Sequence, residues 1–255
     1  MQQIALTTTA LNYTFYMTTP NHTEAGETTA TALGRRRFLS VAGVALATGA
    51  VLLAGCKKDD EDEKVTPTTP SDNDPNAAEI VLADSETGLL NYLYVVEQLH
   101  AGFLEKVTSA FAPEFTAQEQ DFFTQMRDQQ IAHRGFLTAL LGNDITPAAT
   151  LNFSAVNFTN RASVLGYAKT FADMAEAAYN GAAEFFTTPA TLEMVCKIVS
   201  VESRQAAYVR NLVQSGSFAG HDAVDANGLA RLRKPSLVLI QIDPFIRNKI
   251  TSSLD

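Results

Sequence analysis

Four segments with helical periodicity, each roughly 25 residues long, restrict what this chain can fold into. Their ends are recognisable, as in the capping box Thr116–Glu119 that opens the second segment. At 1.5 Å of rise per residue, each segment would form a helix about 38 Å long. Four helices of equal length predict an all-α fold, built as a four-helix bundle. The expected helices cover residues 85–109, 116–142, 160–186 and 188–216.

The links between these segments predict the topology of the bundle. The first and third links have about six and about three residues, so the helices that they join run antiparallel. The second link, Asn143 to Thr159, could span roughly 55 Å when extended, which is enough to cross the whole bundle. We therefore expect two antiparallel hairpins and a long crossover between helices two and three, with a floppy loop in an up-and-down bundle as the alternative. The apolar segment Pro235–Ile246 is expected to form a short C-terminal helix on the bundle.

Polar side chains stand in core positions halfway along three of the four segments. Such residues are costly to bury unless they bind one another or a metal ion. The matching position of the third segment is Ala172, and we interpret the whole inward face of that segment, Tyr179 included, as apolar. The polar core positions are Glu97 and His100, Gln130 and His133, and Glu202 and Gln205.

The helical pattern also predicts which apolar side chains form the core. Cys196, early in the fourth segment, is expected to be a small buried hydrophobic residue. The large side chains expected to be buried are Phe122, Phe123, Leu137, Leu140, Phe171, Ile198 and Leu212.

The chain before the first helix carries export signals. Residues 34–40 read Gly-Arg-Arg-Arg-Phe-Leu-Ser and resemble the twin-arginine export motif, with Arg35 and Arg36 as its paired arginines. A charge-free apolar run, 41–55, follows; it is shorter than the ~20 residues of a membrane span and typical of a signal-peptide core. It leads into Leu-Ala-Gly-Cys, which matches the bacterial lipobox and implies that the thiol of Cys56 is acylated.

These signals predict one folded domain behind a lipid anchor. Apart from Val65, the stretch from Cys56 to Pro75 has no apolar side chain that could drive packing. The signals imply export by the twin-arginine route and anchoring in the cell envelope, at the periplasmic face or the outer-membrane surface, with membrane lipid as the partner of Cys56. Met17 is an alternative start. The expected parts are an unstructured leader (1–33), a twin-arginine lipoprotein signal peptide with a lipobox (34–56), a disordered charged tether (57–78) and the helical domain (79–255).

The charge of the chain argues against one class of partner. Its formal net charge is −9 at pH 7. Nucleic-acid binding needs a basic face that displaces counterions, so we expect no nucleic-acid partner. The sequence indicates no particular protein partner.

Residues 84–214 resemble the ferritin-like domain of exported bacterial lipoproteins and desiccation-related proteins. The resemblance rests on the polar core positions and on residues 172–181, which are similar to the family's Glu-x-x-Gly-x-x-Ala-Tyr-x-Gly. Members with a di-metal site supply Glu from helices one and three and Glu-x-x-His from helices two and four. The resemblance therefore implies retained ligands at Glu97, His133 and Glu202, and lost ligands at Gln130, Ala172 and Gln205.

Two interpretations of this degenerate site remain open. In the first, the amides, carboxylates and histidines form a closed hydrogen-bond network without a cofactor. The protein would then have a non-catalytic structural, binding or stress-related role, which the missing ligands favour. In the second, Glu97, His133 and Glu202, with His100 as an auxiliary ligand, hold one iron or manganese ion in a protein that handles iron or oxidants. Whether the protein is an enzyme is not decided by the sequence.

Overall fold

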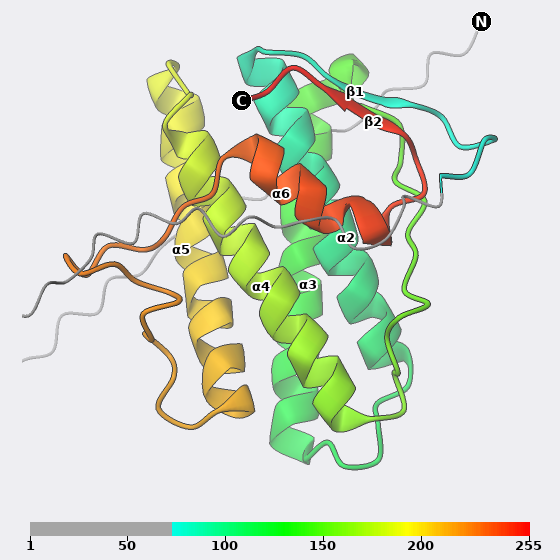
Figure 1. Cartoon of the computed structure of the whole chain (residues 1–255), viewed down its shortest axis with the longest axis vertical. Helices are drawn as coiled ribbons and strands as arrows, with labels where there is room; N and C mark the ends of the chain where they lie inside the picture. The colour runs from blue at the N-terminus through cyan, green and yellow to red at the C-terminus, as the bar shows by residue number, and fades with distance from the viewer. Residues whose placement is uncertain (1–72) are drawn as a thin grey trace, which may run out of the picture. The chain divides into compact units, whose positions relative to one another are not determined.

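The computed structural model describes residues 73–255, which form an all-α bundle (Figure 1). A short helix, α6 (Pro235–Ile242), and a 3₁₀ turn (Asp243–Phe245) follow the bundle in the chain. The predicted fold class, a four-helix bundle with a short C-terminal helix, is confirmed. Arg35, Arg36 and Cys56 lie outside the described residues. The four long helices are α2 (Glu86–Ser109), α3 (Ala117–Leu141), α4 (Arg161–Ala183) and α5 (Pro189–Val213).

Each long helix begins where a local signal specifies it. The Oγ of Ser85 accepts from Gly88 N at 3.0 Å before α2, and the capping box at Thr116 opens α3. The side chain of Asn160 caps α4 by accepting from Ser163 N at 2.8 Å. Pro189, whose missing N–H costs nothing in the first turn, starts α5. Each side-chain cap stabilises its helix by about 1 kcal/mol.

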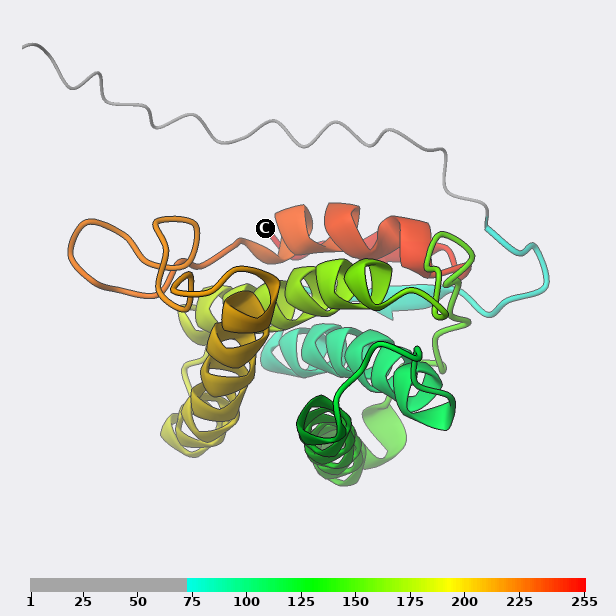
Figure 2. The ribbon, with the colours of Figure 1, turned by 90° about the horizontal axis from the view of Figure 1, so that it is seen from below.

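The helices pack around α2 and α4. In the end-on view of Figure 2, α2 lies between α3 and α4, and α5 packs against α4. Helix α6 crosses α2 and α4 on the side away from α3 and α5. The backbones of α3 and α5 approach each other closely at few points, so these two helices meet mainly through long side chains. Fully buried aromatic side chains fill the centre, namely Tyr92, Phe103, Phe123, Phe171 and Tyr179.

The long crossover between α3 and α4 is held in place by polar side chains of α2. Asn91 donates to Asp144 O at 2.8 Å and accepts from Thr146 N at 2.7 Å. Gln98 accepts from Ala149 N at 2.8 Å. Thr150 N also donates to Asn248 Oδ1 at 2.6 Å. Because buried backbone groups need partners, these side chains together order the link. The alternative of a floppy loop is therefore wrong.

The ends of the described chain meet in a two-stranded parallel sheet. Strand β1 (Ile80–Leu82) pairs with β2 (Ile250–Ser252), and neither strand was predicted because each has only three residues. Just before β1, Asp74 N donates to Arg247 O at 2.8 Å, and Asn248 Nδ2 donates to Ala78 O at 2.7 Å. Residues 74–78, which the sequence placed in the tether, are thus bonded to the C-terminal segment.

The expected core is confirmed in part. Phe123, Leu137, Phe171 and Ile198 are buried, whereas Phe122 and Leu212 are half-buried. Leu140 was wrongly expected in the core, since it is 42% exposed, and Cys196 is also exposed. Leu140 lies five helical turns after Phe122, on the side of α3 that faces the loosely packed α5.

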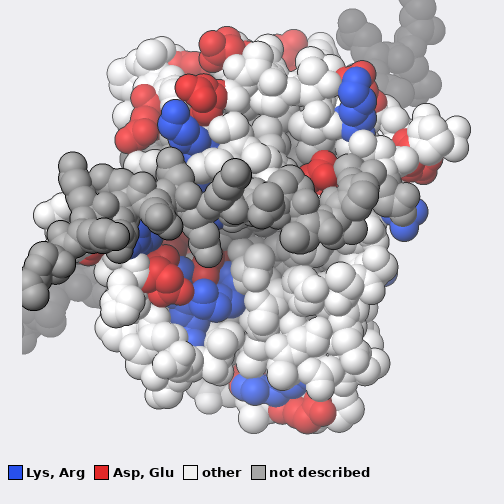
Figure 3. Space-filling view, viewed as in Figure 1, with Lys and Arg blue, Asp and Glu red and all other residues white. Residues whose placement is uncertain are grey.

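Two further features of the described region are the distribution of charge on its surface and the polarity of its helices. On the face seen in Figure 3, acidic and basic side chains lie in small mixed groups. Ion pairs account for part of this mixing, as between Lys169 Nζ and Asp173 Oδ2 at 2.8 Å. Within residues 73–255, none of the helices is both long and apolar enough to cross a membrane.

Candidate metal centre

The polar core positions predicted from the sequence meet at mid-height in the bundle. Glu97 and His100 come from α2, His133 from α3 and Glu202 from α5. One potential ligand atom from each of Glu97, His133 and Glu202 lies within 4.8 Å of the other two. Both carboxylates are fully buried, and the His133 side chain is 13% exposed. The helical period turns each of these side chains inward because each replaces one apolar residue of a core stripe.

His133 lies between the two carboxylates. Its Nδ1 is 3.0 Å from Glu202 Oε1 and 3.4 Å from Glu97 Oε1. His100, which is buried, stands farther back, with Nδ1 at 3.6 Å from Glu202 Oε2. His133 therefore contacts both carboxylates, and His100 contacts only Glu202.

Gln130 bonds to one of the carboxylates and to Gln205. Gln130 Nε2 donates to Glu202 Oε1 at 2.7 Å and to Gln205 Oε1 at 2.9 Å. Gln205 Nε2 in turn donates to Gln129 Oε1 at 2.7 Å. The amides thus form a chain from Glu202 to the surface of α3, and Gln129 is a member of it that the sequence did not indicate. None of these three amides bonds to Glu97. The closed hydrogen-bond network that would join the amides to both carboxylates is therefore not formed.

Several buried polar atoms at the centre remain without a hydrogen bond. Among residues 73–255, Oε2 of Glu97 and Oε2 of Glu202 have no hydrogen-bond partner, and neither ring nitrogen of His100 has one. A buried polar group left without a partner costs about 1–3 kcal/mol. Two carboxylate oxygens and the His100 ring therefore lie at the same height in the bundle without hydrogen bonds. Carboxylates and imidazoles are groups that bind transition-metal cations.

Tyr179 is a site residue that the sequence analysis missed. Its hydroxyl donates to Glu97 Oε1 at 2.7 Å, and both side chains are fully buried. We had interpreted its face of α4 as apolar. The available signal was its spacing, because Tyr179 lies two helical turns after Ala172 on the same inward stripe.

The candidate ligands come from α2, α3 and α5, and α4 supplies none. Ala172 is fully buried and offers no donor atom. Glu176, one turn later, interacts with Ser203 and Arg210 of α5 and is not one of the three residues whose ligand atoms gather. The amide nitrogens of Gln130 and Gln205 are already engaged as donors. The three ligand atoms that gather at the centre are compatible with one metal ion.

Burial and mutual contacts set the charges of the site. Burial and the charge of Glu202 raise the pKa of Glu97. Burial opposes ionisation of Glu202, but contacts with His100 and His133 lower its pKa to about 2. For His133, burial lowers the pKa, but contacts with Glu202 and Glu97 outweigh it and raise the pKa to about 10. At neutral pH the metal-free site thus holds an ionised Glu202 against a protonated His133.

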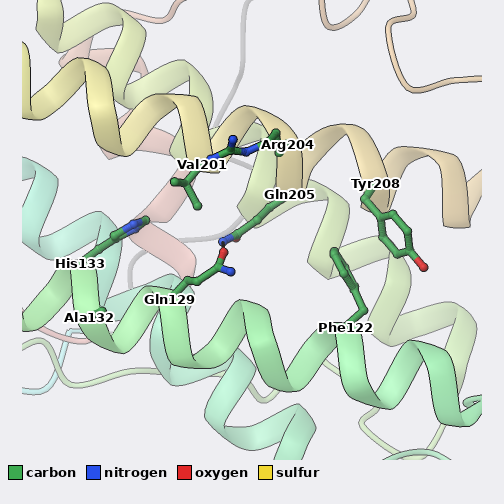
Figure 4. Close-up of a pocket in the computed structure, with 8 residues that line it drawn as sticks. All are labelled: Phe122, Gln129, Ala132, His133, Val201, Arg204, Gln205 and Tyr208. Atoms are coloured by element: carbon green, nitrogen blue, oxygen red, sulfur yellow. Dashed lines mark hydrogen bonds between the residues drawn. The ribbon is translucent and has the colours of Figure 1, made fainter. Parts of the chain in front are cut away.

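A cleft of about 490 Å³ between α3 and α5 reaches His133 from the surface (Figure 4). The Gln129–Gln205 bridge crosses this cleft. The rings of Phe122 and Tyr208 stack at 3.8 Å between centroids and close one end of it.

Comparison with known families matches one part of the chain. Residues 85–215 match the family described as ferritin-like domain, which covers the four long helices and ends before α6. A comparison with curated proteins finds no match.

Proposed function

The chain belongs to the ferritin-like domain family, and we propose that it binds one divalent iron or manganese ion through Glu97, His133 and Glu202. The observation that carries the proposal is the set of buried oxygens without partners at the bundle centre. Carboxylates and imidazole together are a ligand set that suits iron and manganese. His100 is positioned as an auxiliary ligand behind Glu202.

The neighbours of the three ligands support the same assignment. Tyr179 engages Oε1 of Glu97, and Gln130 engages Oε1 of Glu202. Each carboxylate is thereby fixed in orientation with its Oε2 left over. Hydrogen bonds of this kind orient ligands and strengthen metal sites. Iron or manganese, when bound, supplies redox and Lewis-acid chemistry, so a role in iron or oxidant handling follows.

A metal-free bundle with a structural or binding role is the second candidate. The bond of Gln130 to both Glu202 and Gln205 favours it, because these amides satisfy Glu202 Oε1 without any ion. It leaves Glu97 Oε2 and the ring nitrogens of His100 unsatisfied among the described residues. For that reason we place single-metal binding first.

The place of this function in the cell is a further part of the proposal. The twin-arginine motif at Arg35 and Arg36 and the lipobox at Cys56 support export and lipid anchoring. We propose that the bundle acts in the cell envelope, at the end of the charged tether, in a stress-related role like that of the desiccation-related proteins that it resembles.

Metal analysis of the purified protein tests the proposal. After exposure to iron, manganese and zinc and removal of excess metal, we expect about one ion per chain by elemental analysis. Glu202→Gln removes a ligand oxygen and its charge, so the bound metal should fall to a small fraction of that value. Glu193→Gln makes the same change at an exposed position of the same helix and should leave the metal content unchanged. A parent protein that stays free of metal under all three conditions contradicts the proposal.

A further inference from the structure

The cleft between α3 and α5 has the dimensions of a site for a small organic molecule. Its volume of about 490 Å³ lies in the range of small-molecule pockets, roughly 300–1,000 Å³. One end is closed by the Phe122–Tyr208 stack, and the other end is formed by Val201 and His133 (Figure 4). An occupant would therefore lie between an aromatic wall and the exposed part of the His133 ring.

The walls of the cleft offer apolar surface, which favours a ligand with a flat apolar body. The centroids of the Phe122 and Tyr208 rings are 3.8 Å apart, and the planes are inclined by 36°. Their side chains, with that of Val201, offer apolar surface to the cleft. Aromatic side chains bury large apolar areas and favour offset-stacked or edge-to-face contacts with another ring.

Arg204 adds one positive charge to this apolar cleft. Figure 4 shows its side chain lying along α5 over Val201, on the rim near His133. Within residues 73–255, Arg204 has no ion pair, whereas Arg127, Arg134 and Arg210 each pair with a carboxylate. A guanidinium without a protein partner is available to a ligand, and its planar fork matches a carboxylate.

We propose that the α3–α5 cleft binds a small organic carboxylate with a planar apolar body. The carboxylate lies on the Arg204 guanidinium, and the body lies against Val201 and the Phe122–Tyr208 stack. The occupant lies along the Gln129–Gln205 bridge, which crosses the cleft from one helix to the other. The occupant covers the exposed part of the His133 ring, so the cleft shares His133 and Gln205 with the candidate metal centre. Arg204, Val201 and the Phe122–Tyr208 stack belong to the cleft alone.

Titration of the purified full chain with benzoate tests this inference. Benzoate is the smallest planar aromatic carboxylate, and benzyl alcohol serves as its neutral analogue. We expect saturable binding of benzoate by calorimetry, with shifts of the His133 ring resonances in NMR spectra. Arg204→Gln should weaken benzoate binding about tenfold or more, as expected for the loss of one charge-assisted contact. The much weaker binding of benzyl alcohol should not change.

A matched variant separates the cleft from general charge effects. Arg134→Gln removes the same charge from α3, where Arg134 pairs with Glu105 outside the cleft, and should leave benzoate affinity unchanged. The inference is overturned if the parent binds no benzoate, or if Arg204→Gln binds it as tightly as the parent. Measurements on metal-free protein keep the two proposals apart. Benzoate binding without metal binding contradicts only the metal site, and metal binding without benzoate binding contradicts only the cleft ligand.

Discussion

At the scale of single residues, the bundle centre depends on which atom of each side chain is already engaged. Tyr179 and Gln130 each donate a hydrogen bond of 2.7 Å to the Oε1 of a buried carboxylate. Oε2 of Glu97 and Oε2 of Glu202 are left over, with Nδ1 of His133 close to both carboxylates. A cation is the group that can satisfy these atoms together.

The pKa of His133 predicts how metal binding depends on pH. Its carboxylate neighbours raise that pKa to about 10, so the ring must lose a proton before Nδ1 can bind a metal ion. We expect proton release on metal binding at pH 7, and an apparent metal affinity that rises with pH until about 10. Calorimetry in buffers of different ionisation enthalpy measures the protons released. Metal binding without proton release contradicts the assignment of His133 as a ligand.

The same pKa values give the pH dependence of the metal-free fold. The folded-state pKa of His133 lies above its ordinary value of 6.5. Its stabilising contribution is therefore fully present below pH 6.5 and is lost as pH rises through about 10. The pKa of Glu202 is lowered from 4.5 to about 2, so its contribution is present above pH 4.5 and is lost as pH falls through about 2.

The sequence predicted which residues occupy the site but not how they bond. The spacing of Glu97, His133 and Glu202 on their helices was sufficient to predict that they meet at one level. The direction of each amide was not predictable, because the partners of Gln130 come from another helix. The role of Tyr179 was missed because a tyrosine among core positions usually contributes the apolar area of its ring.

At the scale of helices and strands, periodicity and capping residues predicted the bundle closely. The four helices begin within two residues of the positions expected, because Ser85, Thr116, Asn160 and Pro189 specify their starts. The pairing of β1 with β2 was not predictable, because it joins segments about 170 residues apart. The looseness between α3 and α5 depends on tertiary packing and was also missed.

Two leucines of α3 test this difference in packing. Leu137 is 1% exposed in the core, whereas Leu140 is 42% exposed on the side facing α5. Leu137→Ala should reduce the free energy of unfolding by about 2–5 kcal/mol. Leu140→Ala should reduce it by about 1 kcal/mol or less. Chemical denaturation followed by circular dichroism measures both free energies of unfolding. Equal losses would contradict the conclusion that Leu140 lies on a loosely packed side of the bundle.

At the scale of the whole molecule, the bundle is one part of a longer chain whose N-terminal sequence predicts an export signal. Its described region starts at residue 73, and the predicted lipidation site at Cys56 lies outside that region. A charged segment between them contains almost no apolar residues and would let the bundle stand off a membrane. We therefore propose that the location of the protein depends on Cys56 rather than on the bundle.

Cys56→Ser tests the anchor. The thiol is the group that would carry the lipid, so this variant should lose acylation and leave the membrane fraction or accumulate unprocessed. Fractionation of cells and electrophoretic mobility report the change. Cys196→Ser, at an exposed position of α5, is the control and should behave like the parent. A Cys56→Ser protein that stays in the membrane fraction with unchanged mobility contradicts lipid anchoring.

Restoring the family's ligands tests the assignment of the whole bundle. The triple variant Gln130→Glu, Ala172→Glu, Gln205→His replaces each lost ligand in a ferritin-like arrangement. We expect it to bind about two iron ions per chain where the parent binds one. Circular dichroism must first show that its helix content is retained. A folded triple variant that binds no more metal than the parent means that the helix register of the site is wrong.

The location of a bound ion is the most direct test of single-metal binding. Anomalous diffraction from crystals of the manganese-loaded protein should give one strong peak at the bundle centre. The peak should lie about 2.0–2.3 Å from one carboxylate oxygen of Glu97, one of Glu202 and Nδ1 of His133. Density without a peak at that position, or with two peaks there, would contradict a single-metal centre in this bundle.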